Sequence, residues 1–302
     1  MKGKKILVVG SSNTDMVIMT DHFPSPGETV LGGRFLINAG GKGANQAVAA
    51  ARLGGKVTFV GKIGNDIFGK QAVQQLESEG IQVDFVTIDP ENPSGVALIT
   101  VDSKGENSIV VASGSNGTLS PSDFDQAIAE LDETEFVLVQ LEIPIPTVEY
   151  ISRQATQKQK KVVLNPAPAT KLSDELLKNL YLITPNETEA ELLTGIKVTD
   201  EESALKAATV LHDHGVEIVI ITMGATGAFL LANGKSEIIK APKVEAVDTT
   251  AAGDTFNGAL VVALAEGKTI QEAIAFANKA ASISVTRIGA QSSVPFRKEL
   301  LN

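Results

Sequence analysis

The stretch AVDTTAAGDTFNGALVVAL, residues 246–264, joins a loop of small residues to an apolar run that favours a helix. Ala251, Ala252 and Gly253 would let the backbone approach a ligand closely, and the first turn of a helix attracts anions through its unpaired N–H groups and its dipole. Asp254 could accept a proton while those amides stabilise developing negative charge. The combination suits phosphoryl transfer to a hydroxyl group. The alternative interpretation is a solvated turn in which Asp254 caps the helix.

Composition narrows the class of protein that could carry such a site. The 302 residues are 43% hydrophobic and 21% charged, which is ordinary for a globular protein with a large core. A net charge of −10 argues against a nucleic-acid or anionic-membrane partner, although local amides, lysine and metal could still hold ATP. No apolar stretch is long enough to span a bilayer, and the N-terminal run is typical of a first strand and not of a signal peptide. We therefore expect a cytoplasmic protein.

The inventory of reactive side chains limits the chemistry further. The chain has no cysteine, which excludes disulfides, thiolate catalysis and Cys-based metal sites, and its three histidines suggest neither a triad nor a zinc site. Proton transfer is therefore assigned to a carboxylate. The P-loop pattern is absent because Val262 stands where its first glycine would be, and no G-x-G-x-x-G follows the first strand. The sequence therefore lacks the motifs typical of a Walker-type ATPase and of a Rossmann dehydrogenase.

Short apolar runs alternate with helical patterns, which predicts an α/β fold with a mainly parallel central sheet flanked by helices on both faces. The predicted strands are Ile6–Val9, Val57–Val60, Phe136–Gln140, Lys161–Leu164, Leu182–Thr184 and Ile218–Thr222. The predicted helices are Gly43–Leu53, Ile67–Glu79, Pro121–Leu131, Thr147–Gln159, Glu187–Leu193, Glu201–His212, Asp254–Ala265 and Ile270–Thr286. We find no linker, and expect one domain over residues 1–302.

Two segments interrupt this alternation, because Val30–Asn38 and Gly95–Val111 predict strands without helices between them. The second segment has a hairpin signal, with Lys104-Gly105-Glu106 at its turn. Periodicity leaves two interpretations open: an antiparallel extension of the main sheet, or a separate small sheet.

Polar residues follow several of the predicted strands. Asn13 and Asp15 come after the first strand, and Glu142 closes the run 136–141. Ligands of α/β proteins bind at the carboxyl ends of parallel strands. The segment GGKGAN, residues 40–45, opens a helix and could let Lys42 and Asn45 face a polyol. Each feature also has a structural explanation, as turn residues, a tight strand-to-helix turn or a charge that faces water.

Two motifs connect the chain with a known family. The segments DTTAAGDTF (248–256) and NAGGKGANQAVAAAR (38–52) resemble the C-terminal and N-terminal motifs of the PfkB sugar-kinase family. The resemblance runs nearly end to end, and GGKGANQA, LNPAPA, TPNETEAE and GAQ point to the members that phosphorylate D-ribose. It implies transfer of phosphate from ATP to O5 of D-ribose. It also implies a small β-sheet lid, inserted at about residues 14–38 and 95–111, which covers the sugar and joins two copies of the chain as a homodimer.

The resemblance also implies roles for individual residues. Asp254 would be the general base, and Ala251, Ala252 and Gly253 would form the anion hole with it. The residues implied to contact the sugar are Asn13, Thr14, Asp15, Gly41, Lys42, Gly43, Ala44, Asn45, Glu142 and Asp254. Those implied to contact the nucleotide are Asn186, Thr222, Met223, Gly224, Ala225, Thr226, Gly227, Gly253, Asp254 and Asn278.

Two cations belong to the same set of expectations. The resemblance implies Mg²⁺ bound through water near Glu189, a residue whose spacing from Asn186 independently predicts a capping box. It implies K⁺ enclosed largely by backbone carbonyls of Asp248, Thr250, Ser284, Arg287, Gly289 and Ser293. Two alternatives remain at this point. One is another PfkB kinase, acting on deoxyribose, a nucleoside or a sugar phosphate, and the other is a non-catalytic sugar-binding protein on the same fold.

Overall fold

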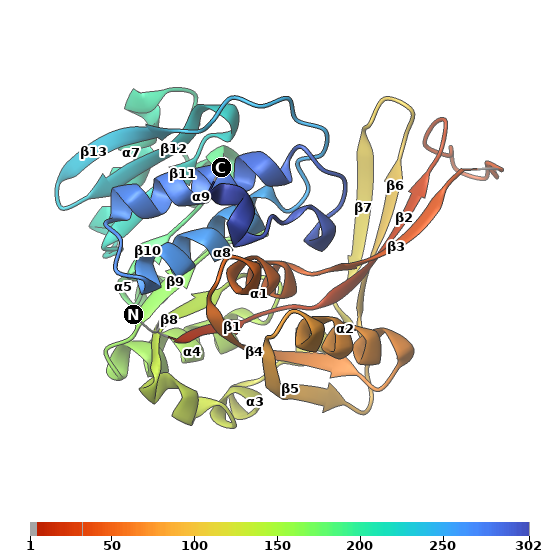
Figure 1. Cartoon of the computed structure of the whole chain (residues 1–302), viewed down its shortest axis with the longest axis horizontal. Coiled ribbons are helices and arrows are strands. Elements are labelled where there is room, and N and C mark those ends of the chain that lie inside the picture. The colour runs from red at the N-terminus through yellow and green to blue at the C-terminus, as the bar shows by residue number, and fades with distance from the viewer. Residues whose placement is uncertain (1–4, 32, 302) are drawn as a thin grey trace.

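The computed structural model describes residues 5–31 and 33–301 and confirms the predicted α/β architecture (Figure 1). The strands of the main sheet are β1 (Lys5–Val9), β4 (Lys56–Gly64), β5 (Gln82–Asp89), β8 (Thr134–Val139), β9 (Lys161–Leu164), β10 (Leu182–Ile183), β11 (Ile218–Thr222), β12 (Gly227–Ala232) and β13 (Lys235–Lys240). Their order is β13-β12-β11-β10-β9-β8-β1-β4-β5. All neighbours are parallel except β11–β12 and β12–β13, which form an antiparallel meander at one edge.

Helices cover both faces of this sheet and form two apolar cores with it. One core contains side chains from α1 (Lys42–Arg52), α2 (Ile67–Ser78), α8 (Ala252–Ala265) and α9 (Ile270–Ser284). The opposite core contains side chains from α3 (Pro121–Asp125), α4 (Ile145–Gln157), α5 (Asp174–Lys178), α6 (Glu187–Thr194) and α7 (Glu201–Asp213). Within the described residues, no helix has the length and apolar character that a bilayer span requires.

The order of the strands places a ligand-binding region near β1. The chain builds outward from β1 in two directions, through β4 to β5 on one side and through β8 to β11 on the other. The loops that leave β1 and β8 therefore diverge at their carboxyl ends, and such a switch point is where open α/β sheets bind ligands. Asn13 and Glu142 belong to these two chain segments.

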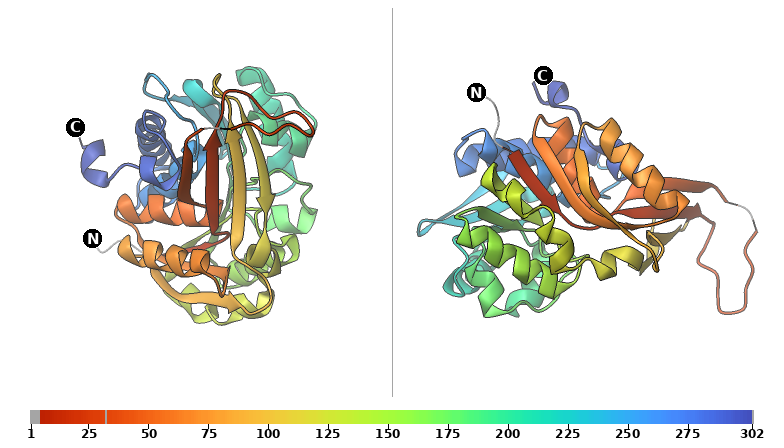
Figure 2. Two further views of the ribbon diagram at one scale, coloured as in Figure 1. Left: turned by 90° about the vertical axis from the view of Figure 1, so that its right-hand side faces the viewer. Right: turned by 90° about the horizontal axis from the view of Figure 1, so that it is seen from below.

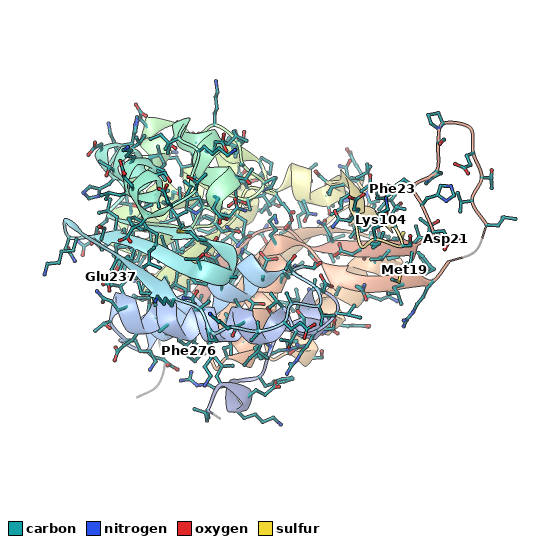
Figure 3. The ribbon with its side chains drawn as sticks, turned by 90° about the horizontal axis from the view of Figure 1, so that it is seen from above. Met19, Asp21, Phe23, Lys104, Glu237 and Phe276 are labelled. Carbon is teal, nitrogen blue, oxygen red and sulfur yellow. The ribbon has the colours of Figure 1, made fainter. Side chains whose placement is uncertain are left out.

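A second sheet of four strands projects from the main body (Figures 1 and 2). Its order is β3-β2-β6-β7, formed by β2 (Asn13–Met19), β3 (Phe35–Gly40), β6 (Gly95–Val101) and β7 (Asn107–Ala112). Figure 3 shows Met19, Asp21, Phe23 and Lys104 together at its far end. The separate small sheet is therefore present, and its hairpin turn is closed by the Asp102 carboxylate, which accepts from the amides of Lys104 and Glu106.

Two sequence predictions of secondary structure need correction, and two further elements are missing from the prediction. The helix predicted at Pro121–Leu131 ends at Asp125. A 3₁₀ helix, Ile128–Asp132, follows it and buries Leu131. The strand predicted at Val30–Asn38 starts only at Phe35, because Gly33 has a φ of 110° that interrupts the extended chain. Edge strand β5 and the short helix α5 were not predicted, since neither has a long apolar run.

Candidate active site

Asp254 lies in the first turn of α8 but does not cap it. The helix starts at Ala252 and its N-cap is Ala251, whose φ of 57° is left-handed. The Asp254 side chain is 6% exposed, and its two oxygens accept from Asn45 Nδ2 at 3.0 Å and Gln46 Nε2 at 2.9 Å. The interpretation of this carboxylate as a helix cap is therefore wrong, because its partners are side chains of α1 and not the amides of its own helix.

The backbone beside Asp254 leaves room for an anion. A Cβ added to Gly253 would meet no atom within 4 Å, so this position borders open space. The amide of Ala252 donates to Thr249 O, whereas the amides of Gly253 and Asp254 lie where a helix provides no internal acceptor. The predicted anion hole thus has two first-turn donors, with the Ala252 amide engaged in the preceding turn.

The glycine-rich segment brings α1 against the end of β1. Gly41 precedes α1 with a φ of 88°, and a Cβ there would come within 2.6 Å of the Asn13 amide nitrogen. Gly43 is packed equally tightly, since its Cβ would meet Ser11 N at 2.6 Å. Both glycines are required by close backbone contact. Ala44 is buried, and its amide donates to the Ser11 carbonyl at 2.8 Å.

Glu142 bridges the start of α1 and the loop after β1. Its Oε2 accepts from Ser11 Oγ at 2.6 Å and from the Lys42 amide at 3.0 Å. This carboxylate is half-buried, so it is not the water-facing charge that a strand end alone would predict.

The first residues of β2 form the third side of the site. Asn13 and Thr14 are 7% and 8% exposed. Asn13 Oδ1 accepts from Asn116 Nδ2 at 2.8 Å, which leaves the side-chain nitrogen of Asn13, Nδ2, as a donor for a ligand. Asp15 of β2 lies opposite Asn38 of β3 in the strand register. A Cβ added to Gly40 would be 2.2 Å from the Asp15 carboxylate.

The charges in this region are unbalanced in favour of carboxylates. Burial, followed by the charges of Glu142 and Asp254, raises the pKa of Asp15 to about 6. Burial would lower the pKa of Lys42, but the nearby carboxylates, Asp254 first, outweigh it and raise the pKa. Burial also raises the pKa of Glu189, which is close enough to sense both Lys42 and Asp254. The sequence-predicted residues therefore come together around one ammonium group.

The residues that the resemblance implies for nucleotide binding come from segments that contact one another. Asn186 and Glu189 form the predicted capping box, with bonds of 2.9 and 2.8 Å. Asn186 forms an isolated parallel β-bridge with Thr222, the last residue of β11. The turn to Gly227, where β12 begins, follows directly. In that turn Met223 and Gly227 are buried, whereas Gly224, Ala225 and Thr226 are exposed.

Asn278 is linked to this turn through backbone contacts. Its Nδ2 donates to the Ile239 carbonyl at 2.8 Å, and the side chain is 5% exposed. Two residues further on, the Ala241 amide donates to the Thr226 carbonyl at 3.4 Å. Asn278 is thus close to the turn, with its amide nitrogen already occupied.

The segments implied for potassium are held together by Asp248. Its two oxygens accept from the amides of Thr250 and Gly289 at 2.9 and 2.8 Å, and these bonds outweigh burial and lower its pKa. The guanidinium of Arg287 pairs with Glu299 and, being a cation itself, cannot bind another cation, so only the backbone carbonyl of Arg287 could do so. Ser284 and Ser293 are fully buried in the adjoining segment. Asp248 thus brings the implied segments together, although the Ser284 carbonyl already accepts from the Arg287 amide at 3.0 Å.

Direct binding of a metal by acidic side chains has no support in the described residues. Among them, no three His, Cys, Asp or Glu side chains are grouped closely enough to hold an ion. Because Glu189 Oε2 already accepts from the Asn186 amide, the donor set fits a magnesium ion held through water.

The sequence does not predict a role for several buried polar residues of the site. Their shared property is that they bond to a predicted site residue or to its direct partner: Ser11, Gln46, Asn116, Gln140 and Asn165. Asn165 follows strand β9, so the rule that selected Glu142 could have found it. Gln46 lies inside the segment 38–52, whereas Asn116 carries no such signal.

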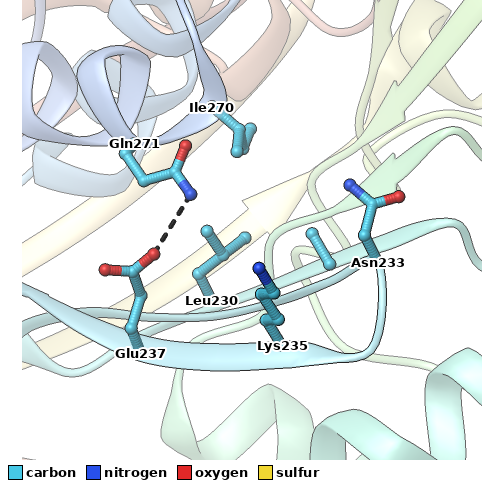
Figure 4. Close-up of a pocket in the computed structure, with 7 residues that line it drawn as sticks. Leu230, Asn233, Lys235, Glu237, Ile270 and Gln271 are labelled. Atoms are coloured by element: carbon cyan, nitrogen blue, oxygen red, sulfur yellow. Dashed lines mark hydrogen bonds between the residues drawn. The ribbon is translucent and has the colours of Figure 1, made fainter.

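A hollow elsewhere on the molecule is separate from these residues. It lies between the β12–β13 hairpin and the start of α9, where Gln271 Nε2 donates to Glu237 Oε1 at 3.1 Å (Figure 4). None of the predicted site residues lines it.

Comparison with known proteins agrees with the fold and with the grouped residues. The chain matches the pfkB family carbohydrate kinases over residues 3–297, and it belongs to this family. It is 52% identical to a ribokinase of Haemophilus influenzae, over 99% of this chain and 97% of the relative. It is 39% identical to a deoxyribokinase of Salmonella typhi, over 96% and 95%. A solved ribokinase of Arabidopsis thaliana, complexed with ribose and ATP, has a TM-score of 0.92 at 34% identity, covering 99% and 98%.

Proposed function

We propose that Asp254 is the general base of this chain in the transfer of the γ-phosphoryl group of ATP to O5 of D-ribose. Ribokinase activity follows from full-length similarity to ribokinases that are 40–52% identical. The single observation that carries the catalytic assignment is the Asp254 carboxylate, buried, bonded to α1 side chains and adjacent to the open space at Gly253.

Sugar binding is assigned to the acceptors and donors gathered at the ends of β1 and β8. Asp15 and Glu142 can accept from hydroxyl groups, and Lys42 can donate to a sugar oxygen. Asn45 Oδ1 is buried and has no hydrogen-bond partner among the described residues. A hydroxyl donor would satisfy it, and a buried acceptor without a partner is otherwise costly.

The chemical step needs one proton acceptor and a site for the transferring phosphoryl group. Asp254 takes the proton of the O5 hydroxyl, O5 forms a bond to the γ-phosphorus, and the bond from that phosphorus to the bridging oxygen breaks to release ADP. The amides of Gly253 and Asp254 stabilise the charge on the phosphoryl oxygens. Asn186, Glu189 and the turn from Thr222 to Gly227 position the nucleotide on the other side of α8.

The two cations complete the proposal. When bound through water near Glu189, magnesium would neutralise charge on the phosphates. Potassium would be held by the carbonyls of the segments joined through Asp248. The Asp248 carboxylate itself already fixes the distance between the loop before α8 and residue Gly289.

The small sheet is proposed to cover the sugar and to join two copies of the chain. Strand register places Asp15 and Asn38 on one face, whereas Ile37, Leu98 and Val110 share the other. These three apolar side chains are 54–65% exposed. An exposed apolar sheet face of this kind is stabilised when a second copy covers it.

A sugar panel tests the proposed function. Mg-ATP is incubated with D-ribose, 2-deoxyribose, other pentoses, hexoses and nucleosides, and release of ADP is measured with identification of the phosphorylated product. We expect ribose 5-phosphate to form fastest. Faster turnover of deoxyribose, the substrate that the name of the Salmonella relative suggests, would overturn the ribose assignment. Absence of ADP release with every acceptor would favour a non-catalytic sugar-binding protein.

A further inference from the structure

Gln46 makes the most constrained side-chain contact of the Asp254 carboxylate. It lies on α1 inside the segment 38–52, is fully buried, and has been given no role of its own above. Its Nε2 donates twice, to Asp254 Oδ1 at 2.9 Å and to Asn165 Oδ1 at 3.0 Å. Its Oε1 accepts from Gln140 Nε2 at 2.6 Å. Both donors and the acceptor of this amide are therefore in use.

The orientation of this amide follows from a backbone group. Asn165 Nδ2 donates to the Thr184 carbonyl at 3.3 Å, and a carbonyl can only accept. Asn165 must therefore turn its own oxygen toward Gln46. An ionised Asp254 is likewise only an acceptor, so Gln46 has to present its nitrogen to both residues. Reversing the amide would oppose oxygen to oxygen at two contacts.

The same hydrogen-bond network continues to the first turn of α8, which carries Asp254. Thr184 Oγ1 donates to Asn257 Oδ1 at 2.7 Å, and Asn257 Nδ2 donates to the Gly253 carbonyl at 2.8 Å. Gln46 is thus connected to Asp254 directly and to the first turn of α8 through Asn165 and Thr184.

Asn45, the other partner of Asp254, is less constrained. Its Nδ2 donates to Asp254 Oδ2, but its oxygen is unpartnered within the described part of the chain. It can therefore change orientation to meet a sugar hydroxyl without breaking a second bond. A carboxylate held by Asn45 alone would be free to follow that change.

We infer that Gln46 is a positioning residue, which holds Asp254 Oδ1 so that Oδ2 is directed at the acceptor hydroxyl. The inference rests on the proposed role of Asp254. Gln46 touches neither sugar nor nucleotide in this assignment, and it acts only through the carboxylate. Removing its donor should therefore lower kcat while leaving the binding of both substrates intact.

The test uses two substitutions of Gln46 in the full chain. Gln46→Met keeps the length of the side chain and removes its polar atoms, and Gln46→Leu removes the same polar atoms from a shorter side chain. For each we expect kcat to fall about 10–100-fold, the range for losing a hydrogen bond to a charged group. The KM values for ribose and ATP should stay within about threefold, since positioning affects only the transition state.

Thr147→Val provides a matched control for lost buried hydrogen bonding. Thr147 is 2% exposed on α4, in the opposite core, and its Oγ1 donates to the Leu119 carbonyl at 2.8 Å. This variant should lose melting temperature to a degree similar to that of the Gln46 variants, with kcat unchanged. If kcat falls equally in the control, the effect is one of general stability and the inference is overturned.

A double substitution separates positioning from a structural role. Combined with Asp254→Asn, Gln46→Met should reduce kcat no further, because the residue through which it acts is already disabled. Losses that multiply, or single variants that keep more than a third of kcat, overturn the inference; if one single variant fails to fold, the other decides. The wild-type protein is assayed first on the sugar panel, so failure of the ribose assignment is seen independently and the Gln46 comparison is then made with the preferred sugar.

Discussion

Replacing Asp254 by Asn separates a catalytic carboxylate from a structural one, and the structure predicts how the amide would fit. Gln46 cannot reverse its amide, so the oxygen of the new Asn side chain would face Gln46 Nε2. The new NH₂ group would then face Asn45, whose oxygen has no partner among the described residues and can turn toward it. Both hydrogen bonds survive, so the free energy of unfolding should change by less than about 1 kcal/mol.

The rate should respond very differently from the stability. An amide cannot accept the proton of O5 at neutral pH, and loss of a positioned general base typically lowers the rate by about 10²–10⁴-fold. That range corresponds to about 2.7–5.4 kcal/mol of transition-state stabilisation. The assay is ADP release at saturating ribose and Mg-ATP, with ribose affinity measured separately by calorimetry. Ribose affinity should fall far less than the rate, because only the contact with Asn45 changes.

Asp123→Asn is the matched control, because Asp123 occupies the same third position of a helix. Its Oδ2 accepts from the Ser120 amide at 2.8 Å and pairs with Lys62 at 3.0 Å. Its substitution should lower the melting temperature and leave kcat unchanged. An Asp254→Asn variant that retains more than about a tenth of the wild-type kcat, well above the range for a lost base, would refute the assignment of Asp254 as the base.

Three further predictions concern the cations, the sugar site and the small sheet. At constant ionic strength, potassium salts should support faster turnover than sodium or tetramethylammonium salts, because the ion would order the loops joined by Asp248; equal rates in all three would reject this. Asp15 has a pKa of about 6, above its ordinary value of 3.8, so its protonated form stabilises the fold below about pH 4 and this contribution is lost as the pH rises through 6. Asp15→Asn should therefore raise the melting temperature of the ligand-free protein at pH 7.5 but not at pH 4, while raising the KM for ribose; an unchanged melting temperature at pH 7.5 would contradict the electrostatic reasoning. Val110→Lys, on the apolar face of the small sheet, should convert a dimer into a monomer in light scattering, and a wild-type monomer at high micromolar concentration would count against the dimer.

The elements that could be predicted from sequence are those whose boundaries are local. Strands Lys161–Leu164 and Ile218–Thr222 match the observed β9 and β11 to the residue, because each is a short apolar run between polar segments. Strand β2 begins with Asn13-Thr14-Asp15, which alone is typical of a turn. These residues are extended because they pair with β3 and with β6, some 80 positions away, and such pairing leaves no local trace.

The candidate site divides in the same way. The glycines at 41 and 43 and the Asp at 254 were identified because their motifs are contiguous in the chain. Whether Asp254 caps a helix could not be decided from sequence, because the answer depends on α8 starting two residues earlier, at Ala252. The partner Asn116, and the contact of the motif residue Gln46 with Asp254, could not be found either, since these residues meet their partners only after the chain has folded.

The charge distribution explains why such a site is stable only as part of a large core. Asp15, Glu142, Asp254 and Glu189 surround the single ammonium of Lys42, and burial raises the pKa of both Asp15 and Glu189. In the ligand-free protein the charged forms of Asp15 and Glu189 therefore oppose folding at neutral pH. A neutral polyol bound as proposed would relieve part of that cost, because its hydroxyl groups would donate to acceptors that otherwise have too few donors. The same groups that lower the stability of the empty site would thus favour the binding of a sugar, and the largely buried strands β1, β8 and β9 contribute compensating stability.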